Sequence, residues 1–284
     1  MNIFETPAAL RTFAFAARAA GRKIALVPTM GNLHEGHRSL IRIARKLADE
    51  VVVSVFVNPI QFGPNEDYAA YPRTWEEDLA ACAAEGASAV FHPSVEAMYP
   101  AGKPSTYVTE TAISPFLCGA SRPGHFNGVC TVVTKLFMAA LPDVAVFGEK
   151  DYQQLAIVRR MVRDLDMPVE IVSAPVSREE DGLARSSRNR FIPEGMRPQA
   201  LSLRHALLAA KAAYDRGERD AQALEAILRE TVAREAPDAV IDYARVSDEE
   251  TLVPLDGAIE RPALAALAVK VGPPRLIDNI VLGG

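Results

Sequence analysis

A run of mostly β-branched residues, 51–57, places the strongest constraint on how this chain folds. A strand that is apolar throughout is buried on both faces, as strands of helix-covered parallel sheets are. A second apolar strand is predicted at 23–29. Between the two, apolar residues of segment 38–48 recur at helical spacing. Strand and helix therefore alternate, which predicts an α/β fold built on a parallel sheet.

The same alternation continues along the chain. We predict helices at 7–20, 74–85, 127–140 and 152–165, and strands at 87–91, 106–109, 143–147 and 169–172. Residues 58–67 are too polar and too interrupted by proline to continue a strand, so they are predicted to form a loop. Residues 119–126 are predicted to form a basic, glycine-rich loop. This loop is either a mobile lid, a wall beside bound phosphate or a plain connection.

A change in composition near residues 175–198, where charged residues, Ser and Gly cluster, marks the predicted domain boundary. Beyond it we predict helices at about 198–215 and 219–234, and strands near 239–246, 264–271 and 275–281. Helices followed by strands indicate a small α+β domain. The predicted organisation is a first domain at 1–176 and a C-terminal α+β lid domain at 177–284. A chain of 284 residues is long enough for two such domains.

Composition narrows the function classes. The net charge of −5 disfavours a nucleic-acid-binding protein, but a local positive pocket could still hold a small anion. Cys82, Cys118 and Cys130 form no close-spaced pair, which favours reduced, buried thiols over a disulfide framework, with one reactive thiol as the alternative. The N-terminus lacks a secretory signal pattern, and no apolar run reaches membrane-spanning length. We therefore expect a soluble, cytoplasmic protein.

Residues 27–37, Val-Pro-Thr-Met-Gly-Asn-Leu-His-Glu-Gly-His, form the turn from the first buried strand into a helix. Ligands bind at such turns in open parallel sheets, and helix N-termini attract phosphate. His34 and His37 are spaced so that both can face one pocket, but they lack the His-Glu-x-x-His spacing of zinc proteases. A nucleotide-binding turn, a metal site and two surface histidines are the three interpretations.

Further segments strengthen the nucleotide interpretation. Segments 58–63 and 148–154 also follow strands, so we expect them to share a pocket with 28–37. Segment 177–190 contains hydroxyls, flexible glycine and several arginines, which suit phosphate oxygens. A solvated linker is the alternative for this segment, but its position at the predicted domain junction favours a lid.

Together, these segments resemble the pantothenate synthetase family. The matching motifs are Pro28–His37, Phe56–Gly63, Arg122–Phe126, Phe147–Leu155 and Ser186–Asn189, and the resemblance extends to Arg275–Asn279. Five motifs in the same order at suitable spacings are highly specific. The resemblance implies a Rossmann-like parallel-sheet nucleotide-binding domain, a smaller C-terminal domain and a homodimer. It also implies condensation of pantoate with β-alanine, using ATP and Mg²⁺, through a pantoyl adenylate.

The resemblance assigns roles to individual residues. His34, His37, Lys150 and Arg188 are the implied catalytic residues, which offset the negative charge of the reacting groups. His37 matches a histidine assigned as proton donor, and stabilisation of phosphate is its alternative role. The implied ATP contacts are Met30, Gly31, Asn32, Leu33, His34, Glu35, Gly36, His37, Gly148, Glu149, Lys150, Asp151, Val176, Arg185, Ser186, Ser187 and Arg188.

Substrate contacts are implied for Gln61 and Gln154, which match the two glutamines that hold pantoate, and Asn58 is expected to orient the substrate. The metal-contacting residues stay unassigned. The family commonly has Met where this chain has Arg185. This additional cation either strengthens triphosphate binding or points into solvent, and we expect Arg185→Met to change ATP affinity modestly.

Two other functions compete with the ligase. One is a nucleotidyl transferase that releases pyrophosphate and keeps the nucleotidylated product, and Gln61 with Gln154 argues against it. The other is a non-catalytic nucleotide sensor. The presence of both histidines, Lys150 and Arg188 argues against this, because degenerate enzymes usually lose such residues.

Overall fold

The computed structural model describes residues 1–64, 66 and 68–283, which form two compact units. Unit 1 comprises residues 1–110, 122–149 and 157–175. Unit 2 comprises residues 111–121, 150–156 and the chain from residue 176 onward. Two short segments that precede residue 177 therefore group with the C-terminal part of the chain, and a domain division at 176/177 stays a prediction.

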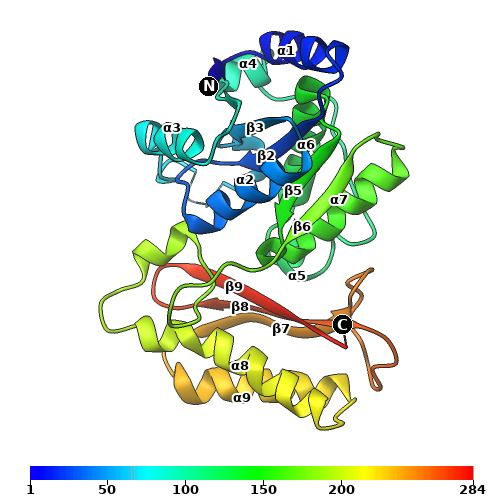
Figure 1. The fold of residues 1–284 in the computed structure, drawn as a ribbon. Coiled ribbons are helices and arrows are strands. Elements are labelled where there is room, and N and C mark those ends of the chain that lie inside the picture. The colour runs from blue at the N-terminus through cyan, green and yellow to red at the C-terminus, as the bar shows by residue number, and fades with distance from the viewer. Residues whose placement is uncertain (65, 67, 284) are drawn as a thin grey trace. The chain divides into compact units, whose positions relative to one another are not determined.

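Unit 1 is built on a six-stranded parallel sheet, which confirms the predicted fold class (Figure 1). In spatial order its strands are β1 (Asn2–Phe4), β4 (Ala89–Phe91), β3 (Glu50–Val55), β2 (Ile24–Thr29), β5 (Val144–Gly148) and β6 (Glu170–Ala174). From β2 the order runs outward through β3 and β4 on one side and through β5 and β6 on the other, with β1 added at the edge beyond β4, so the topological switch point lies between β2 and β5. The central strand β3 is buried at every position, as its apolar run predicts.

Helices cover both faces of this sheet (Figure 1). On one face, α2 (Glu35–Leu47) and α3 (Trp75–Ala84) bury residues such as Ile41 and Cys82 against Val27 and Val53. On the other face, α1 (Pro7–Ala19) and α6 (His125–Ala140) pack against each other and against β2. The remaining regular elements of the N-terminal part are η1 (Pro59–Gln61), α4 (Val95–Met98), η2 (Glu149–Asp151) and α7 (Tyr152–Asp164).

Unit 2 contains a three-stranded antiparallel sheet in the order β7 (Val240–Asp248), β8 (Ala263–Lys270) and β9 (Arg275–Leu282). Helices α8 (Arg197–Asp215) and α9 (Ala221–Glu235) pack on this sheet and on each other (Figure 1). Their buried leucines and alanines form one core with the strands. The predicted α+β character of this region is confirmed. Two shorter elements belong to the unit, α5 (Leu117–Ser121) and η3 (Ser187–Phe191).

Two local predictions are wrong. Residues 106–109 form no strand, because the backbone N–H of Val108 donates to Thr131 Oγ1 of α6 at 3.1 Å and not to a neighbouring strand. The predicted glycine-rich loop at 119–126 is largely helical, since α5 continues to Ser121 and α6 begins at His125. The predicted loop at 58–67 begins with η1, and its positions 65 and 67 lie outside the described residues.

The prediction of reduced, buried thiols is confirmed. Cys82, Cys118 and Cys130 are all free and buried. Burial raises the pKa of the Cys82 and Cys130 thiols to about 12, so both stay protonated at neutral pH. Within the described chain, no helix is long and apolar enough to cross a membrane.

Candidate active site

The turn that follows β2 is held by a buried carboxylate from α3. Asp78 is 2% exposed, and its two oxygens accept hydrogen bonds from the backbone N–H groups of Asn32 at 2.9 Å and Leu33 at 2.7 Å. Gly31 adopts a left-handed φ of 82°. A Cβ atom at Gly31 would lie 2.9 Å from Asp78 Oδ2, so glycine satisfies both the conformation and the close approach. Asp78 therefore sets the backbone path into α2.

The two histidines of the turn have a defined hydrogen-bonding arrangement at the N-terminus of α2. His34 Nδ1 accepts from the Gly36 N–H at 3.1 Å, and His37 Nδ1 accepts from the His34 N–H at 3.3 Å. The rings stack with their centroids 4.0 Å apart. Because Nδ1 is the acceptor in both rings, each neutral imidazole carries its proton on Nε2. Glu35, between them, pairs with Arg42 further along the helix. The turn thus combines two imidazole N–H donors with the positive end of a helix dipole, which suits an anion.

The segment after β3 contacts this turn through Gln61. Gln61 Nε2 lies 3.2 Å from Met30 Sδ. The Gln61 Oε1 atom accepts from Asn58 Nδ2 at 3.0 Å, and the same nitrogen donates to the Gly128 carbonyl at 3.1 Å. Asn58 Oδ1 accepts from the Tyr99 hydroxyl at 2.8 Å. Asn58 is only 1% exposed and its amide bonds within the protein, so it positions Gln61.

The backbone of Gln61 is held from a second direction. Its carbonyl lies 2.8 Å from His125 Nδ1, and His125 Nε2 lies 3.0 Å from Arg122 Nη1. A guanidinium can only donate, so Nε2 accepts and the Nδ1–H group donates to the carbonyl. Arg122 also makes two hydrogen bonds of 2.6 Å to Glu66. Burial alone would raise the pKa of the Glu66 carboxyl, but the hydrogen bonds and charge of Arg122 lower it below its ordinary value. The Arg122–Phe126 motif therefore supports η1.

Helix α6 approaches η1 closely because residue 128 is glycine. A Cβ atom there would lie 2.5 Å from the Ile60 carbonyl oxygen and 2.6 Å from Gln61 Cα. The supporting residues Asp78, Tyr99 and Gly128 were not predicted from the sequence. A local signal exists for Gly128 alone, since a glycine inside a helical pattern indicates close packing.

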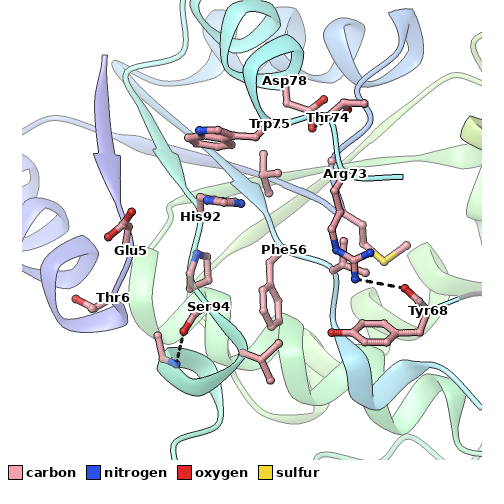
Figure 2. Close-up of a pocket in the computed structure, with 17 residues that line it drawn as sticks. Glu5, Thr6, Phe56, Tyr68, Arg73, Thr74, Trp75, Asp78, His92 and Ser94 are labelled. Carbon is pink, nitrogen blue, oxygen red and sulfur yellow. Dashed lines mark hydrogen bonds between the residues drawn. The ribbon is translucent and has the colours of Figure 1, made fainter. Parts of the chain in front are cut away.

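A pocket of about 640 Å³ lies in unit 1 beside the turn (Figure 2). Of the predicted site residues, Met30 and Gly31 line it. Asp78, whose carboxylate clamps the turn through the Asn32 and Leu33 N–H groups, lines it as well. The Trp75 and His92 rings stack on another wall at a centroid distance of 4.0 Å (Figure 2). Burial lowers the pKa of His92, which favours the neutral ring.

Unit 2 contains the predicted Lys150, Gln154 and Val176. The Lys150 carbonyl accepts from Asn279 Nδ2 at 2.9 Å, and its ammonium lies 3.5 Å from Asp151 Oδ2. Gln154 is partly buried in the first turn of α7. Gly148 and Glu149, in contrast, belong to unit 1, where Gly148 ends strand β5 beside β2.

The 185–190 segment of unit 2 is held by hydrogen bonds within the segment and to residues 178 and 179. Ser186 Oγ accepts from the Arg188 N–H at 3.3 Å, which begins η3. Arg185 Nε donates to the Arg178 carbonyl at 3.0 Å. Asn189 Nδ2 donates to Glu179 Oε1 at 2.6 Å, so Asn189 shapes the turn. The approach of Lys150, Gln154, Ser187 and Arg188 to the histidine turn stays a prediction.

A histidine turn beside the switch point of a parallel sheet, leading into a helix N-terminus, defines a nucleotide-binding α/β protein. The family model of pantoate-beta-alanine ligase matches residues 2–281. The chain belongs to this family.

Relatives and solved structures agree with this assignment. The chain is 53% identical over 286 residues to the pantothenate synthetase of Geobacter sulfurreducens, which covers 100% of this chain and 99% of the relative. The crystal structure of pantothenate synthetase from Thermus thermophilus has a TM-score of 0.90 at 44% identity and covers 99% of both chains. Pantoate-beta-alanine ligase from Francisella tularensis, complexed with beta-gamma ATP and beta-alanine, has a TM-score of 0.75 at 30% identity and covers 99% of this chain and 97% of that one.

Proposed function

We propose that this chain is a pantoate–β-alanine ligase that condenses (R)-pantoate with β-alanine and converts ATP to AMP and pyrophosphate. The observation that carries the proposal is the family match over residues 2–281, which includes the histidine turn and the Gln61 segment. The ATP and β-alanine named for the Francisella tularensis relative support the same pair of ligands here.

In the first step, a pantoate carboxylate oxygen attacks the α-phosphorus of ATP, and the bond from that phosphorus to pyrophosphate breaks. Two anions must meet, so catalysis depends on positioning and on compensation of negative charge. His34 and His37 each offer an Nε2–H group at the N-terminus of α2, and we assign them to phosphate oxygens. Lys150 and Arg188 supply full positive charges. For His37, donation of a hydrogen bond to phosphate is the favoured role, because its Nδ1 already accepts from the backbone.

In the second step, the β-alanine amine attacks the acyl carbon of the pantoyl adenylate. A carbon–nitrogen bond forms, AMP leaves with its oxygen, and the amine nitrogen loses a proton. Gln61 and Gln154 hold pantoate through neutral hydrogen-bonding groups, which suit its hydroxyls. Asn58 acts on pantoate indirectly, because its amide nitrogen donates to Gln61 Oε1 and positions that side chain. The nucleotide is held by the remaining predicted ATP contacts. These lie in the turn, in Gly148–Asp151, at Val176 and in 185–188.

Mg²⁺ fits this chain as an ion carried by the phosphates of ATP. In many ATP-dependent enzymes Mg²⁺ takes phosphate oxygens, waters and at most one or two carboxylates. Among the described residues, no group of three or more His, Cys, Asp or Glu side chains is placed to hold a metal ion. When bound, Mg²⁺ would neutralise phosphate oxygens. We further propose that the protein acts in the cytoplasm and that it is a homodimer. Light scattering on the purified protein would test the homodimer.

The test is to incubate the protein with ATP, Mg²⁺, pantoate and β-alanine and to measure AMP and pantothenate together. Equal amounts are expected. A stable adenylated product without pantothenate would indicate the nucleotidyl transferase, and bound ATP without turnover would indicate the sensor.

Variants then test the assigned roles. His37→Ala and Lys150→Ala should each lower kcat by about 10²–10³-fold, as the loss of one transition-state donor does. The surface variant His205→Ala, on α8, should leave the rate unchanged. Normal rates in His37→Ala and Lys150→Ala would contradict the assigned roles.

A further inference from the structure

We infer that Tyr99 is a positioning residue that holds the Gln61 amide in place toward pantoate. This inference rests on the proposed function, because it concerns how Gln61 meets that substrate. Tyr99 precedes the irregular segment that leads to α5, 38 positions after Gln61 in sequence, and it belongs to the same compact unit. Its hydroxyl acts on Gln61 through the side chain of Asn58.

The orientation of Asn58 follows from its partners. The Gly128 carbonyl can only accept a hydrogen bond, so the Asn58 amide nitrogen must face it, at 3.1 Å. The other end of the amide, Oδ1, then faces the Tyr99 hydroxyl at 2.8 Å, and the hydroxyl must donate. Burial raises the pKa of the Tyr99 phenol well above its ordinary value, so the donor proton is retained throughout the working pH range.

The orientation of Gln61 follows from that of Asn58. Because Asn58 offers its nitrogen at 3.0 Å, the Gln61 atom that faces it must be the acceptor Oε1. The Gln61 amide nitrogen is thereby turned toward Met30 of the nucleotide turn. The amide nitrogen is therefore the end of Gln61 that would meet a ligand there. The matching ligand group is an oxygen acceptor, either a carboxylate or a hydroxyl oxygen of pantoate.

The Tyr99 hydroxyl completes the hydrogen bonds that hold Asn58, and through it Gln61, in place. Without it, Asn58 Oδ1 would be a buried acceptor with no donor, in a side chain that is 1% exposed. The Gly128 carbonyl would still require the Asn58 nitrogen, so the Asn58 amide would shift within its site and not turn over. Its hydrogen bond to Gln61 Oε1 would weaken, and the Gln61 amide nitrogen would no longer be held firmly toward the ligand. Loss of one hydroxyl would thus weaken pantoate binding without any direct contact to pantoate.

Tyr99→Phe isolates this effect. The phenyl ring keeps its place beside Phe56, at a centroid distance of 6.3 Å, and beneath the Lys135 ammonium, at 5.5 Å. We expect kcat/KM for pantoate to fall by about tenfold, the scale of one lost buried hydrogen bond, with ATP KM unchanged within about twofold. The matched control is Tyr107→Phe, since Tyr107 is 45% exposed, and it should change neither value.

A double-mutant cycle separates positioning from a general structural role. If Tyr99 acts through Gln61, Tyr99→Phe should cost nothing further for pantoate in a Gln61→Ala background. An equal loss in both backgrounds, or an ATP KM that rises together with pantoate KM, would overturn the inference.

A second readout needs no turnover. In ligand-free protein, Tyr99→Phe should shift the side-chain amide NMR signals of Gln61, and Tyr107→Phe should not. Unshifted signals would also overturn the inference. Absence of pantothenate formation by the wild-type protein would refute the proposed function instead, and the NMR comparison would still decide the role of Tyr99.

Discussion

Replacement of Asp78 by Asn tests whether the carboxylate clamp sets the geometry of the nucleotide turn. In the wild type, two backbone N–H groups donate to an ionised acceptor at 2.9 and 2.7 Å in a buried environment. Hydrogen bonds to charged groups contribute about 1.5–3 kcal/mol each. Asn keeps the shape and one oxygen. One bond therefore survives in a weaker, neutral form, while the other N–H faces an amide nitrogen that cannot accept.

From these terms we expect Asp78→Asn to lower the free energy of unfolding by about 2–4 kcal/mol. The displaced N–H groups belong to Asn32 and Leu33, which lie within the predicted ATP-contacting turn, so we also expect ATP KM to rise about tenfold or more. Pantoate KM should change less, because Gln61 is held by other residues. Denaturant unfolding measures the stability. Steady-state kinetics measure each KM, with the other two substrates held at saturating concentrations.

Glu77→Gln is the matched control for this change. It removes the same charge from the same first turn of α3, but at an exposed position. Both kinetic constants should stay at wild-type values. If Asp78→Asn lost stability while ATP KM stayed within twofold of wild type, the idea that Asp78 shapes the nucleotide site would be refuted.

Three further predictions follow from the supports of the site and from Arg185. Gly128→Ala should cost about 3 kcal/mol or more of stability and most pantoate turnover, because overpacking against rigid backbone is not easily relieved; unfolding and rate measurements on the variant check this. Arg185→Met should raise ATP KM by a modest factor, about two- to fivefold, and an unchanged value would restrict Arg185 to its hydrogen bond with the Arg178 carbonyl. The folded-state pKa of Glu66 is lowered, so its pairing with Arg122 stabilises the protein above the unfolded pKa and is lost as pH falls through the folded value. Glu66→Gln should therefore be destabilising at pH 7, by about 1–2 kcal/mol, and in denaturant unfolding the difference should shrink as the pH falls below the ordinary pKa of a glutamate and through the lowered folded-state pKa of Glu66.

The sequence predicts elements whose signal is local and strongly patterned. The run at 51–57 identifies β3 because a strand buried on both faces needs apolar residues at every position. Helix α2 was predicted because one side of it must cover the sheet. The strand predicted at 106–109 failed because its backbone donor found a side chain on α6, a contact that depends on tertiary packing. The short edge strand β1 was missed, since three residues carry too little pattern.

The candidate site likewise contains residues that local motifs predict and residues that they do not. The histidine turn and Gln61 were predicted from motifs that lie within short stretches of chain. Asp78 and Tyr99 were not, because each acts on a segment more than 40 positions away, through hydrogen bonds that periodicity cannot indicate. In a single sequence, Asp78 is indistinguishable from the other acidic residues that begin α3.

The supports of the site also explain how an acidic protein can attract anionic substrates. Acidic side chains in and around these segments are already engaged: Glu35 by Arg42, Glu66 by Arg122, and Asp78 by two backbone N–H groups. Their negative charge is compensated within the protein. What the unit offers at the turn is a set of donors, namely imidazole Nε2–H groups, the amide nitrogen of Gln61 and the N-terminus of α2. Oriented donors of this kind need no net positive charge, so a chain of net charge −5 can still bind a triphosphate and a carboxylate at one edge of its sheet.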